Sequence, residues 1–257
     1  MLVIAHRGAN REAIENSWSA FDKAIAGGSQ RIELDVQMTA DGEAVIMHDD
    51  TLERTCGVDV SVASLTRAQL EAIKLLNGEQ IPFLDDVLTK LLPLIELNVE
   101  IKDHTDRAAA EVARLLKKSN FLNRVVISSF YPAPLSYLAN TNQDLQLACL
   151  WGDVVTWPHF AAFSPPVFMQ SCRAKIFHPW TNFLTFEVME QARVRGWKVY
   201  PYTSYMGEES DRESLWALMQ TFGVDGLCTN YPREFKEWLA KNSNADARLN
   251  ALQMPNI

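Results

Sequence analysis

The chain has 257 residues, 47% of them hydrophobic, and a formal net charge of −8. This hydrophobic content excludes an intrinsically disordered chain, and the length is ample for one catalytic domain with a substantial core. The excess of acidic residues argues against a general nucleic-acid-binding surface, because such a surface depends on clustered positive charge.

The first predicted element is the apolar segment Leu2–Ala5, which is too short for a helix and is typical of a buried strand. It places His6 and Arg7 at the carboxyl end of a strand, where catalytic groups collect in parallel α/β folds. No charged leader or cleavage site precedes this strand, so we expect a cytoplasmic protein. No apolar run approaches the roughly 18 residues that span a bilayer, so we expect no integral membrane association.

A second strand is predicted at Ile32–Val36, where apolar and acidic residues alternate. Because side chains of a strand point alternately to its two faces, Glu33 and Asp35 share one face. Two carboxylates held side by side repel each other unless a divalent cation or a basic group lies between them. A hard cation with oxygen ligands, Mg²⁺ or Ca²⁺, is the natural occupant.

A short apolar strand, Ala44–Asp49, follows the turn signal Asp41-Gly42 and ends near His48. A single histidine at a strand end is commonly structural. Together with His6, however, it supplies the two proton-transfer groups that cleavage of a phosphodiester needs, one base and one acid. Histidine suits either step because its unperturbed pKa lies nearest to neutrality.

The segment from Thr51 to Pro82 interrupts the alternation of strands and helices and contains its own small helix signal, with Ser64 or Thr66 as the capping residue. At about thirty residues it is too small to bury a core by itself. We therefore predict one domain over residues 1–257, with residues 51–82 as a lid-like inserted subdomain.

The segment Leu94–Lys102 has one apolar face and one polar face that carries Glu100 and Lys102. A half-exposed strand would give the same alternation. In a barrel, by contrast, the polar face points inward, where charged groups are costly unless they are paired or bind a metal. Glu100 then becomes a third metal-binding carboxylate, and Lys102 becomes a cation for phosphate.

Helical and apolar segments alternate through the rest of the chain. Helices are predicted at Asn16–Ala26, Phe83–Leu91, Arg107–Lys118, Thr185–Arg195, Arg212–Thr221 and Pro232–Lys241. Further strands are predicted at Arg124–Ser128, Leu145–Leu150, Ala174–Phe177, Lys198–Tyr202 and Asp225–Thr229. With the strands that begin at Leu2, Ile32 and Leu94, the count is eight, which a closed parallel barrel requires. Periodicity alone does not distinguish that barrel from an open doubly wound sheet.

The motifs identified so far occur in the order and spacing of a known family. They are His6-Arg7-Gly8, Glu15-Asn16, Ile32-Glu33-Leu34-Asp35-Val36, Asp41-Gly42, His48-Asp49, Leu52, Arg54-Thr55 and Glu100-Ile101-Lys102, with a weaker closing segment at Gly223–Pro232. In these motifs the chain resembles the glycerophosphodiester phosphodiesterase family. The resemblance implies an α/β fold, a (β/α)8 TIM barrel, with a small insertion after the second strand that overhangs the active site.

The resemblance also implies a role for each matched residue and a reaction. Glu33, Asp35 and Glu100 would bind one divalent cation, His6 and His48 would act as general acid and base, and Arg7 and Lys102 would hold the phosphate of a small-molecule glycerophosphodiester. In the family's proposed mechanism the glycerol 2-hydroxyl attacks phosphorus, and water opens the resulting cyclic phosphate to sn-glycerol 3-phosphate after an alcohol has left.

The chain departs from the family pattern at a few positions. Asn230 replaces a frequent aspartate, and the segment Lys198–Ser204 replaces a Trp-Thr-Val-Asn strand end that lines the substrate pocket in many members. His178 and Tyr202 follow predicted strands, and we expect them near the barrel mouth or in the core. Two other readings stay open, a related barrel phosphodiesterase acting on lysophospholipids and a non-catalytic protein that binds phosphodiesters.

Overall fold

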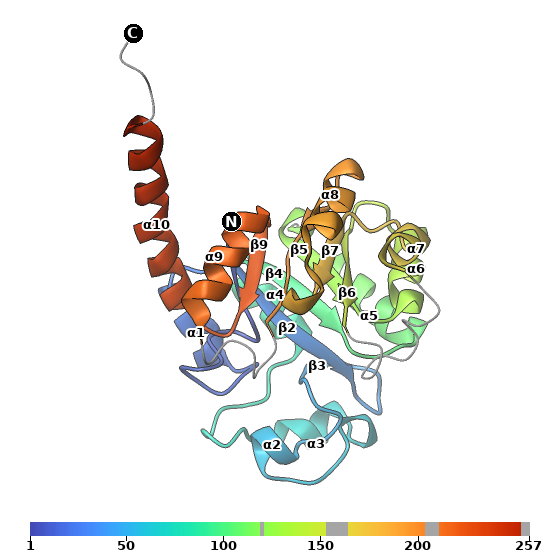
Figure 1. Ribbon diagram of the computed structural model, residues 1–257. Coiled ribbons are helices and arrows are strands. Elements are labelled where there is room, and N and C mark those ends of the chain that lie inside the picture. Colours follow the sequence, from blue (N-terminus) through green and yellow to red (C-terminus); the bar gives the residue numbers. More distant parts are fainter. Residues whose placement is uncertain (119–120, 153–163, 204–210, 253–257) are drawn as a thin grey trace.

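The computed structural model describes residues 1–118, 121–152, 164–203 and 211–252. Eight parallel strands neighbour one another in the order β8-β7-β6-β5-β4-β2-β1-β9. Their bounds are β1 (Leu2–Ala5), β2 (Arg31–Met38), β4 (Glu96–Ile101), β5 (Val125–Ser129), β6 (Gln146–Trp151), β7 (Ile176–Pro179), β8 (Lys198–Val199) and β9 (Gly226–Thr229). The two ends of this order meet, because the amide of Asp225 donates to the carbonyl of Val199 and that of Cys228 to the carbonyl of Pro201. The predicted barrel is therefore confirmed, nearly closed (Figure 1).

The alternation of side chains along the strands divides the barrel into two environments. Ile32, Leu34 and Val36 of β2 are fully buried in the main hydrophobic core, which includes residues of the surrounding helices. The intervening Glu33 and Asp35 of the same strand face the inside of the barrel. Both carboxylates are buried on the face opposite to these apolar side chains, as the alternation along the strand predicts.

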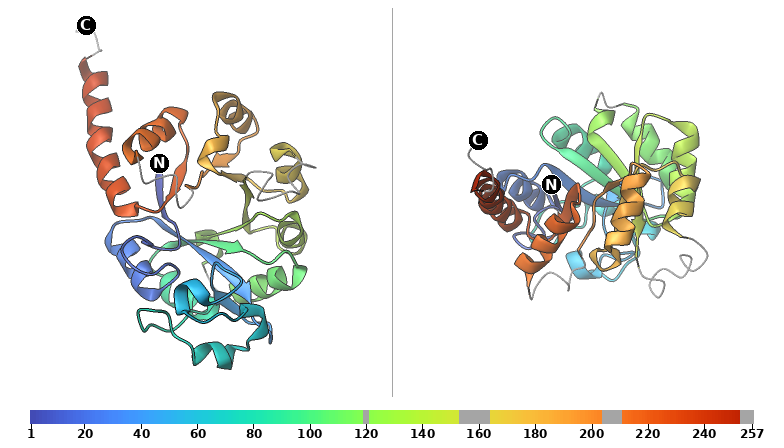
Figure 2. Two further views of the ribbon diagram at one scale, coloured as in Figure 1. Left: turned by 60° about the horizontal axis from the view of Figure 1, so that its bottom comes forward. Right: turned by 45° about the horizontal axis from the view of Figure 1, so that its top comes forward.

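Helices surround the strands (Figures 1 and 2). They are α1 (Trp18–Ala26), α4 (Leu84–Leu91), α5 (Asp106–Leu116), α6 (Pro132–Thr141), α7 (Pro165–Ser171), α8 (Phe186–Val194), α9 (Arg212–Phe222) and α10 (Pro232–Leu252). Within the described part of the chain, none of the helices is both long and apolar enough to cross a membrane.

The sequence pattern did not predict α6 and α7, and it predicted the end of α10 too early, at Lys241. Both missed helices begin with prolines in their first turn. Proline breaks the interior of a helix but suits its first turn, where the missing N–H has no partner to lose. Figure 2 shows α10 running past the barrel toward the C-terminus, which a pattern based on core burial does not predict.

The insertion begins after β3 (Ala44–Ile46), which pairs antiparallel with β2 as a hairpin and is not a strand of the barrel. It contains α2 (Glu53–Cys56), a short 3₁₀ turn η1 (Val62–Ser64) and α3 (Arg67–Glu71). Thr66, and not Ser64, caps α3, in a reciprocal arrangement with Gln69. A second hydrophobic cluster joins the insertion to β3 and to the start of α4; its buried members are Val45, Met47, Leu52, Cys56, Val62, Leu70, Leu75, Ile81 and Phe83. The domain boundaries 1–257 and 51–82 themselves stay predictions.

Candidate active site

The first site residues are positioned by a tight turn at the end of β1. Arg7 and Gly8 both adopt positive φ, 55° and 78°. A Cβ atom on Gly8 would lie 2.8 Å from the backbone of Ala20, so only glycine fits between β1 and α1 here. The turn brings the backbone amide of Arg7 within 2.9 Å of Glu33 Oε2, to which it donates a hydrogen bond.

The three predicted metal ligands come together inside the barrel. Asp35 lies directly opposite Glu100 in the register of β2 and β4, and Glu33 lies one pleat below on the same face. One carboxylate oxygen from each of Glu33, Asp35 and Glu100 lies within 4.8 Å of the others, and all three residues are buried. Glu33 Oε1 and Asp35 Oδ1 have no hydrogen-bond partner. Buried carboxylate oxygens without donors are ligands for a hard divalent cation, so these residues fit the predicted ion.

The proton affinities of this cluster show the repulsion that a cation would relieve. Burial raises the pKa of Glu33 well above its usual value, and the charges of Asp35 and Glu100 raise it further. Burial would also raise the pKa of Asp35, but the charges of Arg7, His48 and Lys102 outweigh it and hold that pKa below its usual range. The cluster therefore keeps one carboxyl protonated at a pH where an ordinary glutamate has lost its proton.

Two cationic side chains border the carboxylates. Lys102 Nζ lies 2.8 Å from Glu100 Oε1 and 3.7 Å from Asp35 Oδ1. Arg7 Nε lies 3.3 Å from Asp35 Oδ2. Burial opposes the charge on Lys102, but the neighbouring Glu100 and Asp35 more than compensate and raise its pKa. Both cations consequently stay charged where an anionic substrate group would enter.

The two predicted catalytic histidines lie at different ends of the carboxylate cluster. His6 Nδ1 lies 2.8 Å from Asn230 Oδ1, an oxygen that also accepts from Asn10 Nδ2. Because Asn230 Oδ1 is an acceptor, it places the His6 proton on Nδ1 and leaves Nε2, which lies 4.0 Å from Glu33 Oε2, with its lone pair. Burial, helped by the charge of Arg7, lowers the pKa of His6 to about 3. His48 Nδ1 lies 2.6 Å from Asp49 Oδ1.

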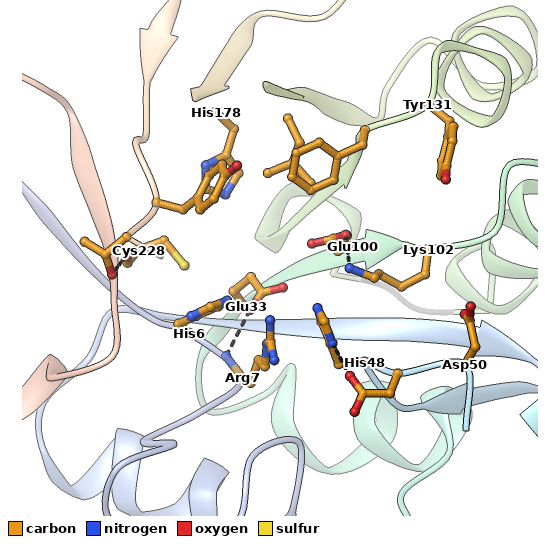
Figure 3. Close-up of a pocket in the computed structure, with 15 residues that line it drawn as sticks. His6, Arg7, Glu33, His48, Asp50, Glu100, Lys102, Tyr131, His178 and Cys228 are labelled. Carbon is orange, nitrogen blue, oxygen red and sulfur yellow. Dashed lines mark hydrogen bonds and ion pairs between the residues drawn. The ribbon is translucent and has the colours of Figure 1, made fainter. Parts of the chain in front are cut away.

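A cavity of about 550 Å³ joins these groups into one site (Figure 3). It is lined by six of the seven predicted site residues, while Asp35 lies almost fully buried beneath them. Aromatic and apolar groups also line it: Phe130, Tyr131, Leu150, His178, Tyr202 and Cys228. His178 is buried, with Nε2 3.4 Å from Asn98 Nδ2, and Tyr202 and Thr203 come from the atypical segment 198–204, of which residue 204 lies outside the described residues.

Several residues that support the site had no role predicted from the sequence. Asn16 Nδ2 donates to Asp35 Oδ2 at 2.8 Å, and Glu15 accepts from both Arg7 and Arg54. Glu15, Asn16 and Arg54 stand inside motifs that carry the family resemblance, and this position was the signal that could have identified them. Asn230 was recognised only as a departure from the family pattern, because its contact with His6 spans 224 residues of sequence.

Known proteins share this fold and sequence pattern. The model of the glycerophosphoryl diester phosphodiesterase family matches residues 6–234. The glycerophosphodiester phosphodiesterase of Caldanaerobacter subterraneus is 33% identical over 247 residues, 90% of this chain and 94% of that protein. An uncharacterized Bacillus subtilis protein, YqiK, is 30% identical over 245 residues, 90% of this chain and 96% of that protein.

Solved structures agree on the fold. The crystal structure of the Agrobacterium tumefaciens glycerophosphodiester phosphodiesterase superposes with a TM-score of 0.77 at 24% identity, over 91% of this chain and 98% of that one. An Oleispira antarctica phosphodiesterase in complex with the product sn-glycerol-3-phosphate gives 0.79 at 22% identity, over 93% and 97%. Fold and sequence together define an enzyme of the phosphoric diester hydrolase class. The chain belongs to the glycerophosphoryl diester phosphodiesterase family.

Proposed function

We propose that this protein hydrolyses glycerophosphodiesters to sn-glycerol 3-phosphate and an alcohol, with one divalent cation and with His6 and His48 as the acid–base pair. The observation that carries the proposal is the meeting of three buried carboxylates, two histidines and two cations around one cavity. The family membership and the product named for the Oleispira antarctica phosphodiesterase support the same substrate class.

In this proposal Glu33, Asp35 and Glu100 hold the cation, Mg²⁺ or Ca²⁺. Once bound, the ion supplies positive charge for a phosphoryl oxygen as negative charge develops there. Arg7 and Lys102 bind the remaining phosphoryl oxygens, because both are cationic and both border the carboxylates on the side of the cavity. The phosphate is thereby held between the two cationic side chains and the two histidines.

The two histidines are suited to different halves of the first step. Burial keeps the His6 imidazole neutral, and its Nε2 lone pair faces the site, so His6 accepts the proton of the attacking glycerol 2-hydroxyl. His48 is held by Asp49, is more exposed than His6, and donates a proton to the departing alkoxide. Their roles reverse when water opens the cyclic phosphate: His48 accepts the proton of the attacking water, and His6 returns its proton to the departing 2-oxygen.

The proposal is tested by assaying the chelator-stripped protein on glycerophosphocholine and glycerophosphoethanolamine, with and without added Mg²⁺ or Ca²⁺. We expect release of sn-glycerol 3-phosphate only when one of the ions is restored. A parallel assay on lysophosphatidylcholine tests the alternative substrate class. Failure to cleave any of the three diesters with either ion, while the protein still binds glycerophosphocholine, would instead support a non-catalytic binding protein.

A further inference from the structure

Arg54, which lies on α2 of the insertion and outside the cavity lining, pairs with Glu15 and with Asp49, and Asp49 itself lines the cavity. Its Nη1 and Nη2 donate to the two carboxylate oxygens of Glu15, at 2.7 and 2.8 Å. Its Nε donates to Asp49 Oδ2 at 2.6 Å. One guanidinium therefore joins two carboxylates that belong to different parts of the site.

The Asp49 branch of this network ends at a proposed catalytic group. While Asp49 Oδ2 accepts from Arg54, Asp49 Oδ1 pairs with His48 Nδ1 at 2.6 Å. His48 is 28% exposed and follows a hairpin, so no barrel strand holds its ring. The carboxylate of Asp49 orients the imidazole with Nδ1 turned away from the cavity, and Arg54 in turn orients that carboxylate.

The Glu15 branch ends at a proposed phosphate-binding group. Glu15 is 7% exposed and receives Arg7 Nη1 at 2.9 Å on the same oxygen that receives Arg54 Nη2. Arg7 is thereby held beside Asp35, at the edge of the metal-ligand cluster. Without Arg54, the buried carboxylate of Glu15 would keep only Arg7 as a cationic partner among the contacts described above. Arg7 would then be drawn toward Glu15 and away from the cavity.

We propose that Arg54 is a positioning residue, which holds the His48 ring through Asp49 and the Arg7 guanidinium through Glu15. The proposal rests on the proposed function, in which His48 and Arg7 act on the substrate. Arginine suits this place because its planar fork donates to both oxygens of Glu15 and still offers Nε to Asp49. A lysine has one compact ammonium group and cannot reproduce three donors in that geometry.

The test compares Arg54→Ala and Arg54→Lys with Arg67→Ala. Arg67 is a matched control, because it is also an arginine of the insertion that pairs with several carboxylates and ties the insertion to α4 through Asp85. It contacts neither Glu15 nor Asp49 in the described contacts. If a loss of kcat only reflected loosening of the insertion, Arg67→Ala would therefore show the same loss.

We expect Arg54→Ala to lower kcat by at least about tenfold, a part of the hundredfold or more that acid–base catalysis commonly contributes. We also expect KM to rise, because Arg7 is no longer held at the cavity. Metal affinity should stay within about twofold, since Arg54 touches none of the three ligands.

Arg54→Lys should keep a kcat between those of wild type and Arg54→Ala. Added guanidinium ion should partly restore the kcat of Arg54→Ala. Arg67→Ala should lower the melting temperature and leave kcat unchanged.

Unchanged kcat in Arg54→Ala, or an equal loss in Arg67→Ala, would overturn the proposal. A second readout does not depend on turnover: the Nδ1 proton of His48, followed by ¹⁵N-resolved NMR, should be protected from exchange in wild type and in Arg67→Ala but not in Arg54→Ala. If wild type cleaves no diester, the proposed function fails, while the NMR comparison still decides the role of Arg54. If Arg54→Ala does not fold, Arg54→Lys provides the same comparison.

Discussion

At the scale of single residues, the two histidines differ in how the protein holds them. His6 is 12% exposed and pairs with a neutral amide, Asn230, whereas His48 is 28% exposed and pairs with a carboxylate, Asp49. A neutral partner leaves His6 as a neutral base. The carboxylate of Asp49 orients the His48 ring, which acts as the acid in the proposed mechanism. In the proposed mechanism the two histidines therefore act in different roles because their hydrogen-bond partners differ.

We expect His48→Ala to lower turnover by at least about a hundredfold, because the departing alkoxide then lacks its proton donor. Folding and metal binding should remain nearly intact, since the proposed metal ligands are Glu33, Asp35 and Glu100 and do not include His48. Steady-state turnover and a metal titration on the same preparation measure both effects. His104→Ala is the matched control, because His104 is exposed, packs near Tyr131 and is not part of the cavity lining. Near-normal turnover in His48→Ala would remove this residue from the mechanism.

The raised pKa of Glu33 makes metal binding dependent on pH. In the metal-free protein this carboxyl holds a proton that a bound cation must displace. Affinity should therefore fall as the pH falls, with Kd rising up to about tenfold per pH unit below the pKa of Glu33. Calorimetric titration in buffers with different ionisation enthalpies measures both the affinity and the proton released. Glu100→Gln should weaken binding at every pH, and an affinity that does not change with pH would contradict the protonated cluster.

At the scale of elements, the sequence predicted the barrel strands because their alternation is local. It predicted six helices whose apolar faces pack on the barrel, and it missed α6 and α7, where prolines in the first turn resemble a break. It also predicted the short strand after the turn at Asp41-Gly42, which the structure has as β3. The structure adds that β3 pairs antiparallel with β2, so that His48 follows a hairpin; local periodicity does not say which strands pair.

The turn after β1 brings Gly8 against the backbone of Ala20 in α1, and this close approach gives a prediction for the element. Gly8→Ala should lower the free energy of unfolding by about 2–4 kcal/mol, since it adds a backbone overlap with Ala20 to the cost of a positive φ. Gly223→Ala is the matched control: Gly223 has φ 72°, but a Cβ there meets nothing within 4 Å. It should cost only about 1 kcal/mol. Equal losses in chemical denaturation would show that the close approach of α1 is not important.

At the scale of the whole molecule, the insertion is joined to the barrel by shared packing and by ion pairs. Its hydrophobic cluster takes Val45 from β3 and Phe83 from the segment before α4. Because residues on both sides of the insertion complete its core, we propose that insertion and barrel unfold together as one domain.

Leu70→Ala tests this proposal, because Leu70 is fully buried in the insertion cluster. It should lower the free energy of unfolding of the whole protein by about 2–5 kcal/mol and leave a single transition. Leu76→Ala, at a side chain that is 66% exposed, should change stability little. Two separate transitions in calorimetry, only the first of them shifted by Leu70→Ala, would show that the insertion is an independent unit.

The sequence by itself determined on which face of each strand the acidic residues lie, and it predicted seven of the candidate site residues. Alternation placed Glu33 with Asp35, and strand ends placed His6 and Arg7, because both are properties of a few consecutive residues. Only the tertiary structure decided which distant groups meet. The register of β2 against β4 sets Asp35 opposite Glu100, and barrel closure brings Asn230 to His6. Such contacts depend on the packing of the whole chain, and short-range sequence patterns carry no information about them.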